Sequence, residues 1–195
     1  MVLNGPSTYN TVSSHFAAQI DINGDCFSDL VMLSGANNNL LEIYTKNNHN
    51  SYEYSFIDLT KNMKWMSFTD LDANGAPDML LVSLEQGNYL PYALLSSNTP
   101  GDICSPFSTP SFDPANLKAI SLPKGYQILS DSNLKIGDFN FDGYPDILGV
   151  YSIDSFRKVS ILSNRHDLVF NVLDADMAPL QQISNPLQAC LYDFS

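Results

Sequence analysis

The chain has 195 residues, of which 44% are hydrophobic and 15% charged, and its formal net charge is −12 at pH 7. This composition predicts a globular protein with a buried core and excludes a chain that is disordered throughout. The negative charge argues against nucleic acid or an anionic membrane as partner, because both would repel the chain. No apolar run approaches the roughly 18 residues of a membrane span, so we expect no direct membrane insertion by this segment.

Short apolar runs separated by Gly, Asn and Pro turns follow one another along the chain, without sustained helical periodicity. The strands expected from these runs cover residues 16–20, 30–34, 40–46 and 52–59, then 64–69, 79–84 and 92–97, then 134–137, 147–153, 159–163 and 168–173, and finally 188–192. They group into repeat units over residues 14–60, 61–131 and 132–186, with the start of a fourth unit over 187–195. Four strands per unit are typical of a propeller blade. The sequence therefore predicts an all-β fold, with residues 1–195 as a single partial β-propeller domain of three four-stranded blades and the start of a fourth.

The second unit is lengthened by a proline-rich insert over residues 98–125, which contains five prolines. Such proline density is incompatible with a central strand. The insert is either a surface excursion between strands or a binding loop, and the sequence leaves both open.

A nine-residue pattern occurs three times, beginning at Asp21, Asp70 and Asp138. Side-chain oxygens at positions 1, 3, 5 and 9 and the backbone carbonyl at position 7 can surround one Ca²⁺ at roughly 2.3–2.6 Å. Glycine at position 6 permits the sharp turn. An EF-hand is excluded because it needs a Glu at position 12. The alternative is that Asp, Asn and Gly only form turns, but three copies with one spacing favour calcium, with two or three ions bound.

The second and third loops follow the pattern in full. Their predicted ligands are Asp70, Asp72, Asn74, Asp78 and the carbonyl of Ala76, and Asp138, Asn140, Asp142, Asp146 and the carbonyl of Tyr144. The first loop departs from it, because Cys26 stands at position 6 and Gly24 at position 4. A non-glycine residue must then adopt a turn conformation that favours glycine. We therefore expect weaker binding by the first set, which is Asp21, Asn23, Asp25, Asp29 and the carbonyl of Phe27.

The chain has three cysteines, Cys26, Cys104 and Cys190. An odd number allows at most one internal disulfide and leaves one thiol over. The sequence does not choose among the pairings.

The repeated order of strand, Asp-rich loop and apolar strand resembles the FG-GAP/VCBS-type repeat of β-propellers such as those in integrin α chains. Residues 134–148, Leu-Lys-Ile-Gly-Asp-Phe-Asn-Phe-Asp-Gly-Tyr-Pro-Asp-Ile-Leu, are similar in particular to the T-cell immunomodulatory protein family of integrin-α-like membrane proteins. The resemblance implies a calcium-binding scaffold for protein interaction or adhesion, with an immunomodulatory role. It also implies a fragment of the ectodomain of a single-pass membrane protein, located outside the cell or in the secretory lumen, with signal and anchor elsewhere and a protein partner on or outside the cell surface.

A propeller needs about four to eight blades to close. Three blades and the start of a fourth would leave open edges, which predict self-association or pairing with a partner.

The sequence contains none of the motifs of nucleophilic, zinc or phosphate chemistry, and its three histidines lie outside the repeated loops, so we expect no enzyme. An alternative function is carbohydrate binding, as a lectin-like propeller or as an accessory domain of a polysaccharide-processing enzyme. Trp65 and the ten tyrosines would then supply stacking surfaces. The competing interpretation is that Trp65 and most tyrosines pack between blades.

Overall fold

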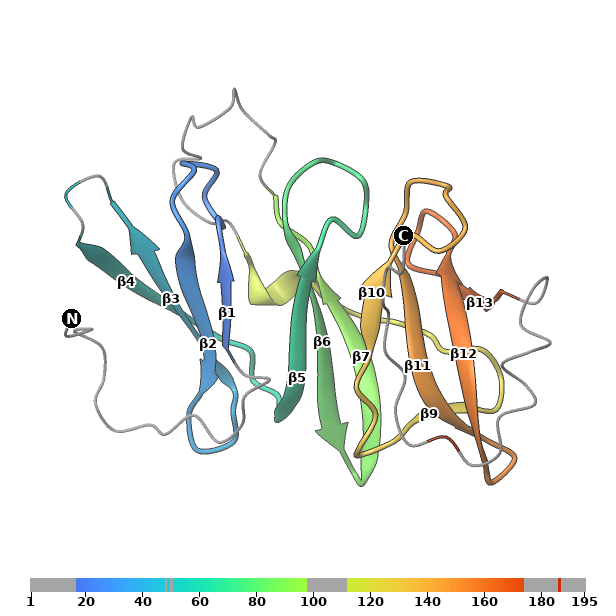
Figure 1. Ribbon diagram of the computed structural model, residues 1–195. Coiled ribbons are helices and arrows are strands. Elements are labelled where there is room, and N and C mark those ends of the chain that lie inside the picture. The colour runs from blue at the N-terminus through green and yellow to red at the C-terminus, as the bar shows by residue number, and fades with distance from the viewer. Residues whose placement is uncertain (1–16, 48, 50, 98–111, 174–185, 187–195) are drawn as a thin grey trace.

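The computed structural model describes residues 17–47, 49, 51–97, 112–173 and 186. These residues form strands β1 to β13 and one short 3-10 helix, and every pairing between the strands is antiparallel (Figure 1). The predicted all-β class is confirmed.

The first meander is a four-stranded sheet in which each strand pairs with the next along the chain. Its strands are β1 (Ala17–Ile20), β2 (Asp29–Ser34), β3 (Leu40–Lys46) and β4 (Tyr52–Asp58). They agree with the four predicted runs to within a residue at each described boundary, because polar turns mark their ends.

The second meander contains β5 (Met63–Thr69), β6 (Asp78–Glu85), β7 (Asn88–Leu94) and β8 (Leu117–Ala119), paired in that order. The predicted third strand over 92–97 was wrong, because β7 begins four residues earlier and ends at Leu94. The proline-rich insert supplies the helix η2 (Pro114–Asn116) and then β8, while its residues 98–111 lie outside the described residues. In the described part of the chain β8 pairs with β7 alone, so it is an edge strand.

The third meander contains β10 (Lys135–Gly137), β11 (Asp146–Ile153), β12 (Phe156–Asn164) and β13 (Phe170–Val172). A further short strand, β9 (Tyr126–Ile128), pairs with β11 and, through Ile128 opposite Tyr89, with β7. This strand joins the second and third meanders into one nine-stranded sheet. The predicted strand over 188–192 and the start of a fourth unit lie outside the described residues.

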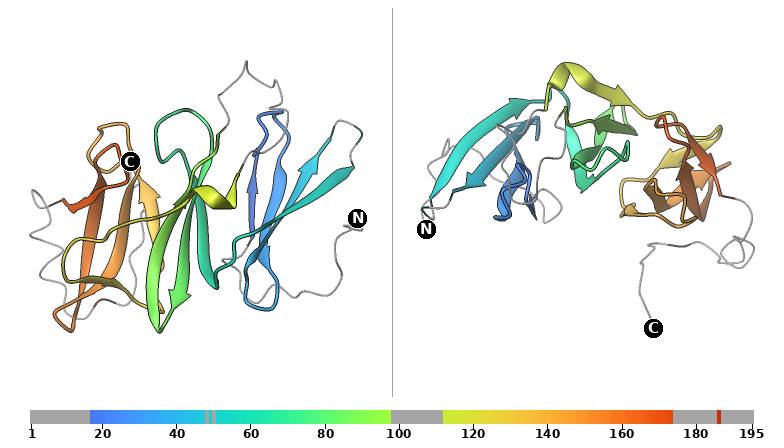
Figure 2. Two further views of the ribbon diagram at one scale, coloured as in Figure 1. Left: turned by 180° about the vertical axis from the view of Figure 1, so that it is seen from behind. Right: turned by 90° about the horizontal axis from the view of Figure 1, so that it is seen from above.

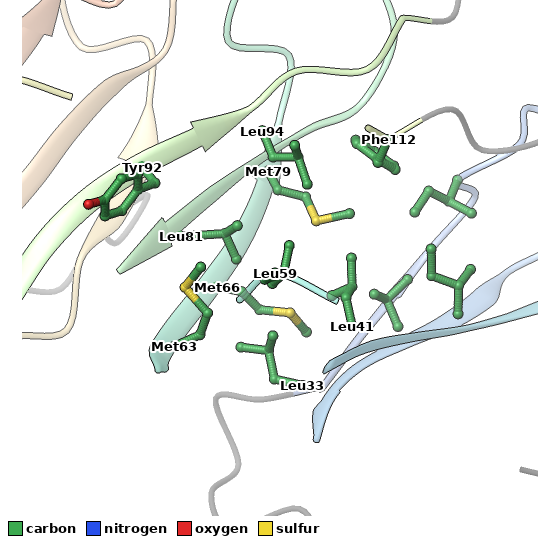
Figure 3. Packing of buried hydrophobic residues seen from close by; sticks show 13 residues of the cluster. Leu33, Leu41, Leu59, Met63, Met66, Met79, Leu81, Tyr92, Leu94 and Phe112 are labelled. Carbon is green, nitrogen blue, oxygen red and sulfur yellow. The ribbon is translucent and has the colours of Figure 1, made fainter. Parts of the chain in front are cut away.

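Two hydrophobic cores lie between consecutive meanders. Strand β6 contributes to both, because its side chains alternate between the two faces of the sheet. Met79 and Leu81 belong to the core shared with the first meander, whereas Leu80 and Val82 belong to the core shared with the third. Figure 3 shows the first core, in which Leu33 and Leu41 of the first meander meet residues of the second. Burial on both faces explains why β6 reads as a continuous apolar run.

The first strands of the three meanders line one groove. Residues 18–20 of β1, 65–69 of β5 and 133–136 around β10 surround a space of about 580 Å³. Among the described residues, each of these strands pairs with a single neighbour, so its other edge is free of strand pairing. Seen from above, the three meanders stand side by side (Figure 2).

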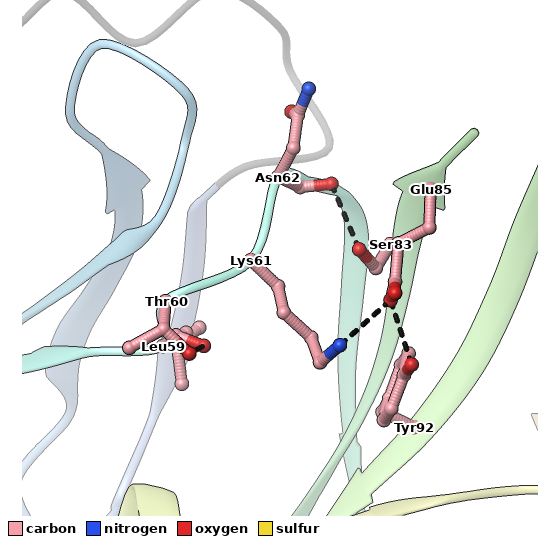
Figure 4. A network of polar contacts seen from close by, with 7 residues as sticks. All are labelled: Leu59, Thr60, Lys61, Asn62, Ser83, Glu85 and Tyr92. Atoms are coloured by element: carbon pink, nitrogen blue, oxygen red, sulfur yellow. Dashed lines mark hydrogen bonds and ion pairs between the residues drawn. The ribbon is translucent and has the colours of Figure 1, made fainter. Parts of the chain in front are cut away.

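A polar network fastens the connection between the first and second meanders (Figure 4). Lys61 Nζ lies 2.9 Å from Glu85 Oε1, which also accepts a 2.7 Å hydrogen bond from the Tyr92 hydroxyl. The Tyr92 hydrogen bond and the Lys61 ammonium hold the pKa of Glu85 below its ordinary value. The side-chain hydroxyl of Ser83 donates to the carbonyl of Asn62 (3.3 Å). These contacts fix Lys61 and Asn62 against β6 and β7.

Candidate metal centres

All three Asp-rich loops lie at the same end of the sheets, at the top of Figure 1. Each loop begins directly after the first strand of its meander and ends at the first residue of the second strand, which is Asp29, Asp78 or Asp146. The antiparallel pairing of those two strands therefore holds positions 1 and 9 of each loop close together.

The aspartate at position 1 is the acceptor around which each loop curls. Its two carboxylate oxygens accept the backbone N–H groups of positions 5 and 6. The bonds from position 6 are Cys26 N to Asp21 Oδ2 (2.8 Å), Gly75 N to Asp70 Oδ2 (2.7 Å) and Gly143 N to Asp138 Oδ2 (2.9 Å). Because the pattern is the same in all three copies, the sequence repeat is a repeat of local geometry.

Positions 3 and 5 carry one aspartate and one asparagine in every loop, in either order. In each copy the position 3 oxygen accepts the position 5 N–H, and the position 5 oxygen accepts the position 7 N–H. Where asparagine stands at position 3, its Nδ2 donates to the position 5 carboxylate, as Asn23 does to Asp25 (3.1 Å) and Asn140 to Asp142 (2.8 Å). The second loop has the reverse order, with Asp72 and Asn74.

The aspartate at position 9 is fully buried in each loop. One carboxylate oxygen accepts the N–H of position 2, and the other accepts a backbone N–H near the end of the third strand. These donors are Ile22 (3.0 Å) and Lys46 (2.8 Å) to Asp29, Leu71 (2.8 Å) and Ser96 (2.7 Å) to Asp78, and Phe139 and Asn164 (both 3.0 Å) to Asp146. Position 9 thus ties the loop to the third strand. Sequence reasoning did not find these donors, because they lie 17 or 18 residues away in the chain.

Burial raises the pKa of all three position 9 carboxyls, and the two backbone hydrogen bonds oppose this shift. The effect is largest at Asp78, whose pKa rises from an ordinary 3.8 to about 6, with smaller contributions from Asp72 and Asp70. Removing a carboxylate from water disfavours its charged form, and a bound cation would reverse that preference.

Two positions of each loop have left-handed backbone. Position 4 is Gly24 (φ 76°), Ala73 (φ 58°) or Phe141 (φ 59°), and position 6 is Cys26 (φ 67°), Gly75 (φ 85°) or Gly143 (φ 88°). The prediction that Cys26 adopts a conformation that favours glycine is confirmed. Each loop nevertheless places one glycine and one other residue at these two positions, so this strain does not set the first loop apart. Its weaker calcium binding stays a prediction.

Cys26 is disulfide-bonded. The two other cysteines, Cys104 and Cys190, both lie outside the described residues. The bond anchors the tip of the first loop covalently, which the other two loops, having no cysteine, do not share.

The second loop brings its carboxylates closest together. One oxygen each from Asp70, Asp72 and Asp78 lies within 4.8 Å of the others, and in the described part of the chain this is the one such group of three acidic, cysteine or histidine side chains. The first and third loops offer three carboxylates and one amide as well, but not within that distance. The donors in all three loops are oxygens, which suit a hard cation such as Ca²⁺.

All fifteen predicted ligand positions fall on described residues. At position 7, Phe27 is exposed, Ala76 is buried and the ring of Tyr144 lies 5.0 Å from that of His166. His49 and His166 are exposed, and His15 lies outside the described residues. Trp65 is partly buried against the core between the second and third meanders, which agrees with packing between units.

The chain matches no protein-family model and no curated protein. None of the helical residues that the structure describes forms a segment long and apolar enough to cross a membrane. Fold and loops together define an all-β protein of antiparallel sheets with three repeated acidic loops.

Proposed function

We propose that this chain is a calcium-binding repeat scaffold and that its meanders are blades of a β-propeller of the FG-GAP type. Three features support the propeller. The meanders are four-stranded, they pack face to face through two cores, and their first strands line one groove. Blades of a propeller are four-stranded sheets arranged radially around a central channel.

The observation that carries the calcium proposal is the cluster of Asp70, Asp72 and Asp78 within 4.8 Å. At that separation two carboxylates repel by on the order of 3 kcal/mol at an effective dielectric constant of about 20, and by less where water reaches them. Backbone N–H groups offset part of this repulsion. A divalent cation would neutralise the remainder, so binding would contribute to the stability of the fold.

Calcium in this role is structural, and recognition of a partner falls to the surface loops. We place the protein outside the cell or in the secretory lumen, where calcium is plentiful, as the ectodomain of a membrane protein that binds another protein in adhesion or signalling. The outward strand edges of the first and last units would pair with further blades or with a second copy.

Thermal unfolding with calcium and with EDTA tests the proposal. At a calcium concentration about 100 times Kd, one site that binds only the folded chain adds about 2.7 kcal/mol. For a chain of this length that raises Tm by roughly 5–10 °C. Asp72→Ala should reduce this calcium-dependent increment, whereas substitution of an exposed residue toward the other end of the sheet, such as Lys158→Ala, should leave it intact. Equal Tm values in calcium and EDTA, with no heat of binding by calorimetry, would contradict the proposal.

Carbohydrate binding is a second candidate, supported by a cleft of about 260 Å³ between the second and third meanders. Trp65 and Tyr89 line it together with Asp131 and Asn133, which combines aromatic faces with hydrogen-bonding groups. A glycan array tests this function, with Trp65→Ala and Tyr89→Ala as variants that should lose any signal. An array without hits for the folded native chain would exclude it.

A further inference from the structure

Asn164, the last residue of β12, contacts two of the candidate metal loops at once. Its backbone N–H donates to Oδ1 of Asp146, at position 9 of the third loop (3.0 Å). Its side-chain Nδ2 donates to the carbonyl of Leu71, at position 2 of the second loop (3.0 Å). Leu71 lies 93 residues earlier in the chain, so this bond is a tertiary link between meanders.

The link continues into the second loop. The N–H of Leu71 donates to Oδ2 of Asp78, at position 9 of that loop (2.8 Å). Hydrogen bonds therefore run from Asp146 through Asn164 and Leu71 to Asp78, and each of these four residues has 0% exposure. Because water does not reach the chain of bonds, neither loop can shift its position 9 carboxylate without breaking a bond that water cannot replace.

The side chain of Asn164 makes one hydrogen bond in the described part of the chain, to the carbonyl of Leu71. Its Oδ1 is buried and accepts no hydrogen bond in the described part of the chain. A buried polar atom without a partner is unfavourable, so core packing alone does not explain an amide side chain at this position. The hydrogen bond that its Nδ2 donates to Leu71 is therefore the contribution of this side chain to the structure.

The first loop is held differently. There the residue that corresponds to Asn164 is Lys46, whose N–H donates to Asp29 Oδ1 (2.8 Å). The Lys46 ammonium lies over the ring of Phe27, 5.5 Å from its centre, and so stays with its own loop. These contacts of Lys46 therefore remain within the first meander, whereas those of Asn164 join two.

We propose that Asn164 couples the second and third metal sites, so that a cation in one raises the affinity of the other. This inference rests on the proposed calcium binding. A metal that fixes Asp78 also fixes Leu71, and through Asn164 it fixes the carboxylate of Asp146 before the third site is filled. The ordering that the second binding event requires is then partly complete, which is positive cooperativity.

Terbium, a luminescent substitute for Ca²⁺, allows the third site to be distinguished from the second. Tyr144 lies in the third loop and can sensitise an ion bound there, whereas the second loop contains no aromatic residue. Terbium affinity at the third site is measured by tyrosine-sensitised emission in the native chain and in Asp72→Ala, which disables the second site. The same pair is then measured with Asn164→Ser added, since serine is the native residue at the corresponding position 96.

We expect Asp72→Ala to weaken terbium binding at the third site by about fivefold or more in the native background, and to leave it nearly unchanged when Asn164 is serine. The control Ser163→Ala removes the acceptor of the 2.9 Å bond from Asn140 Nδ2 and a side-chain hydrogen bond to Asp146, but leaves the bond between Asn164 and Leu71 in place. It should change affinity at the third site itself but keep the fivefold ratio. In metal-free protein, Asn164→Ser should also speed amide exchange at Leu71 and leave that at Ile22 in the first loop unchanged.

A ratio that is the same in both backgrounds, or unaltered exchange at Leu71, overturns the coupling while leaving calcium binding in place. Absence of any terbium binding by the native chain overturns the proposed function and the coupling with it. If Asn164→Ser does not fold, the native pair decides, because a ratio of one between the native chain and Asp72→Ala overturns the coupling and a ratio of five or more supports it.

Discussion

The buried aspartate at position 9 should stabilise the fold in the absence of any metal, and Asp78→Ala tests this in the second loop. The substitution leaves the N–H groups of Leu71 and Ser96 without their acceptor in a buried place. Asp72→Ala is the matched change, because it removes a carboxylate from the same cluster. Asp72 is only partly buried, and among the described residues it accepts one bond, of 3.2 Å, from the N–H of Asn74.

The magnitude follows from these contacts. A buried donor left unpaired costs about 1–3 kcal/mol, so two of them cost about 2–6 kcal/mol. At neutral pH the net loss of stability is smaller, because the substitution also removes a buried charge. A pKa raised from 3.8 to about 6 corresponds to on the order of 3 kcal/mol. At pH 5 Asp78 is largely protonated in the folded chain but already ionised in the unfolded chain, so roughly half of this charge effect remains and the loss should be larger than at pH 7 by about 1–1.5 kcal/mol. Asp72→Ala should cost about 1 kcal/mol or less.

Urea unfolding at pH 5 with EDTA, followed by far-ultraviolet circular dichroism, gives the two free energies of unfolding. The same measurement at pH 7 should show a smaller loss for Asp78→Ala. Equal losses for the two variants in metal-free protein would refute the reasoning, because the position 9 carboxylate would then have no role beyond that of its neighbours.

Three further outcomes are expected. The pKa of Asp78 is higher in the folded chain than its ordinary 3.8, so this group's contribution to metal-free stability is complete below about pH 4 and is lost as pH rises through about 6. The loss is on the order of 3 kcal/mol. Urea midpoints across this range measure the dependence of stability on pH, which Asp78→Asn should flatten. Gly143→Ala should cost about 1–2 kcal/mol from backbone strain alone, since φ is 88° and an added Cβ meets nothing within 4 Å. Phe141 has φ 59° and 91% exposure, so Phe141→Gly should leave stability equal or raise it by up to about 1 kcal/mol. Thermal unfolding of both variants tests this pair. Gly149→Ala should cost about 1–3 kcal/mol, because its Cβ would lie 2.7 Å from Leu134 Cδ2, and adding Leu134→Val should recover part of that loss in the same assay.

Loop geometry and most strands were predictable from sequence because both are local. The run at 40–46 is bounded by asparagines and is β3 as predicted. The error at β7 comes from Pro91, which argues against a strand interior. Its carbonyl accepts from the N–H of Ile120, just beyond the end of β8, so its ring nitrogen points to the same side, between the short strands β8 and β9, and the ladder with β6 is intact. Strands β8 and β9 have three residues each and are too short for periodicity to show.

The left-handed conformation at position 4 could have been read from the sequence. Glycine stands at position 4 in the first loop and at position 6 in the other two, which indicates that both positions favour positive φ. Asn164 left no such signal, because its contact with Leu71 depends on how two meanders pack. The backbone N–H groups near strand ends that donate to position 9 were likewise not predictable from local sequence, because they lie 17 or 18 residues away.

Much of the aspartate pattern is explained by backbone hydrogen bonds, and this separates the structural demand from the metal. Positions 1 and 9 use both carboxylate oxygens on N–H groups, and Asp25 and Asp142 use their second oxygen on a neighbouring amide. Asp72 is different, because in the described part of the chain its one recorded bond is to the N–H of Asn74. An asparagine would accept that bond equally well, so the negative charge of Asp72 is the feature that hydrogen bonding leaves unexplained.

Asp72→Asn therefore isolates the metal. It keeps the Oδ1 acceptor and removes one of three charges that lie within 4.8 Å. Metal-free stability should stay equal or rise by up to about 1 kcal/mol as repulsion falls, while calcium affinity of the second loop should fall by about tenfold or more, since affinity follows the number of ligand charges. Calorimetric titration with calcium beside urea unfolding in EDTA measures both. A loss of metal-free stability with unchanged calcium affinity would show that the charge of Asp72 serves the fold and that the loops evolved as turns.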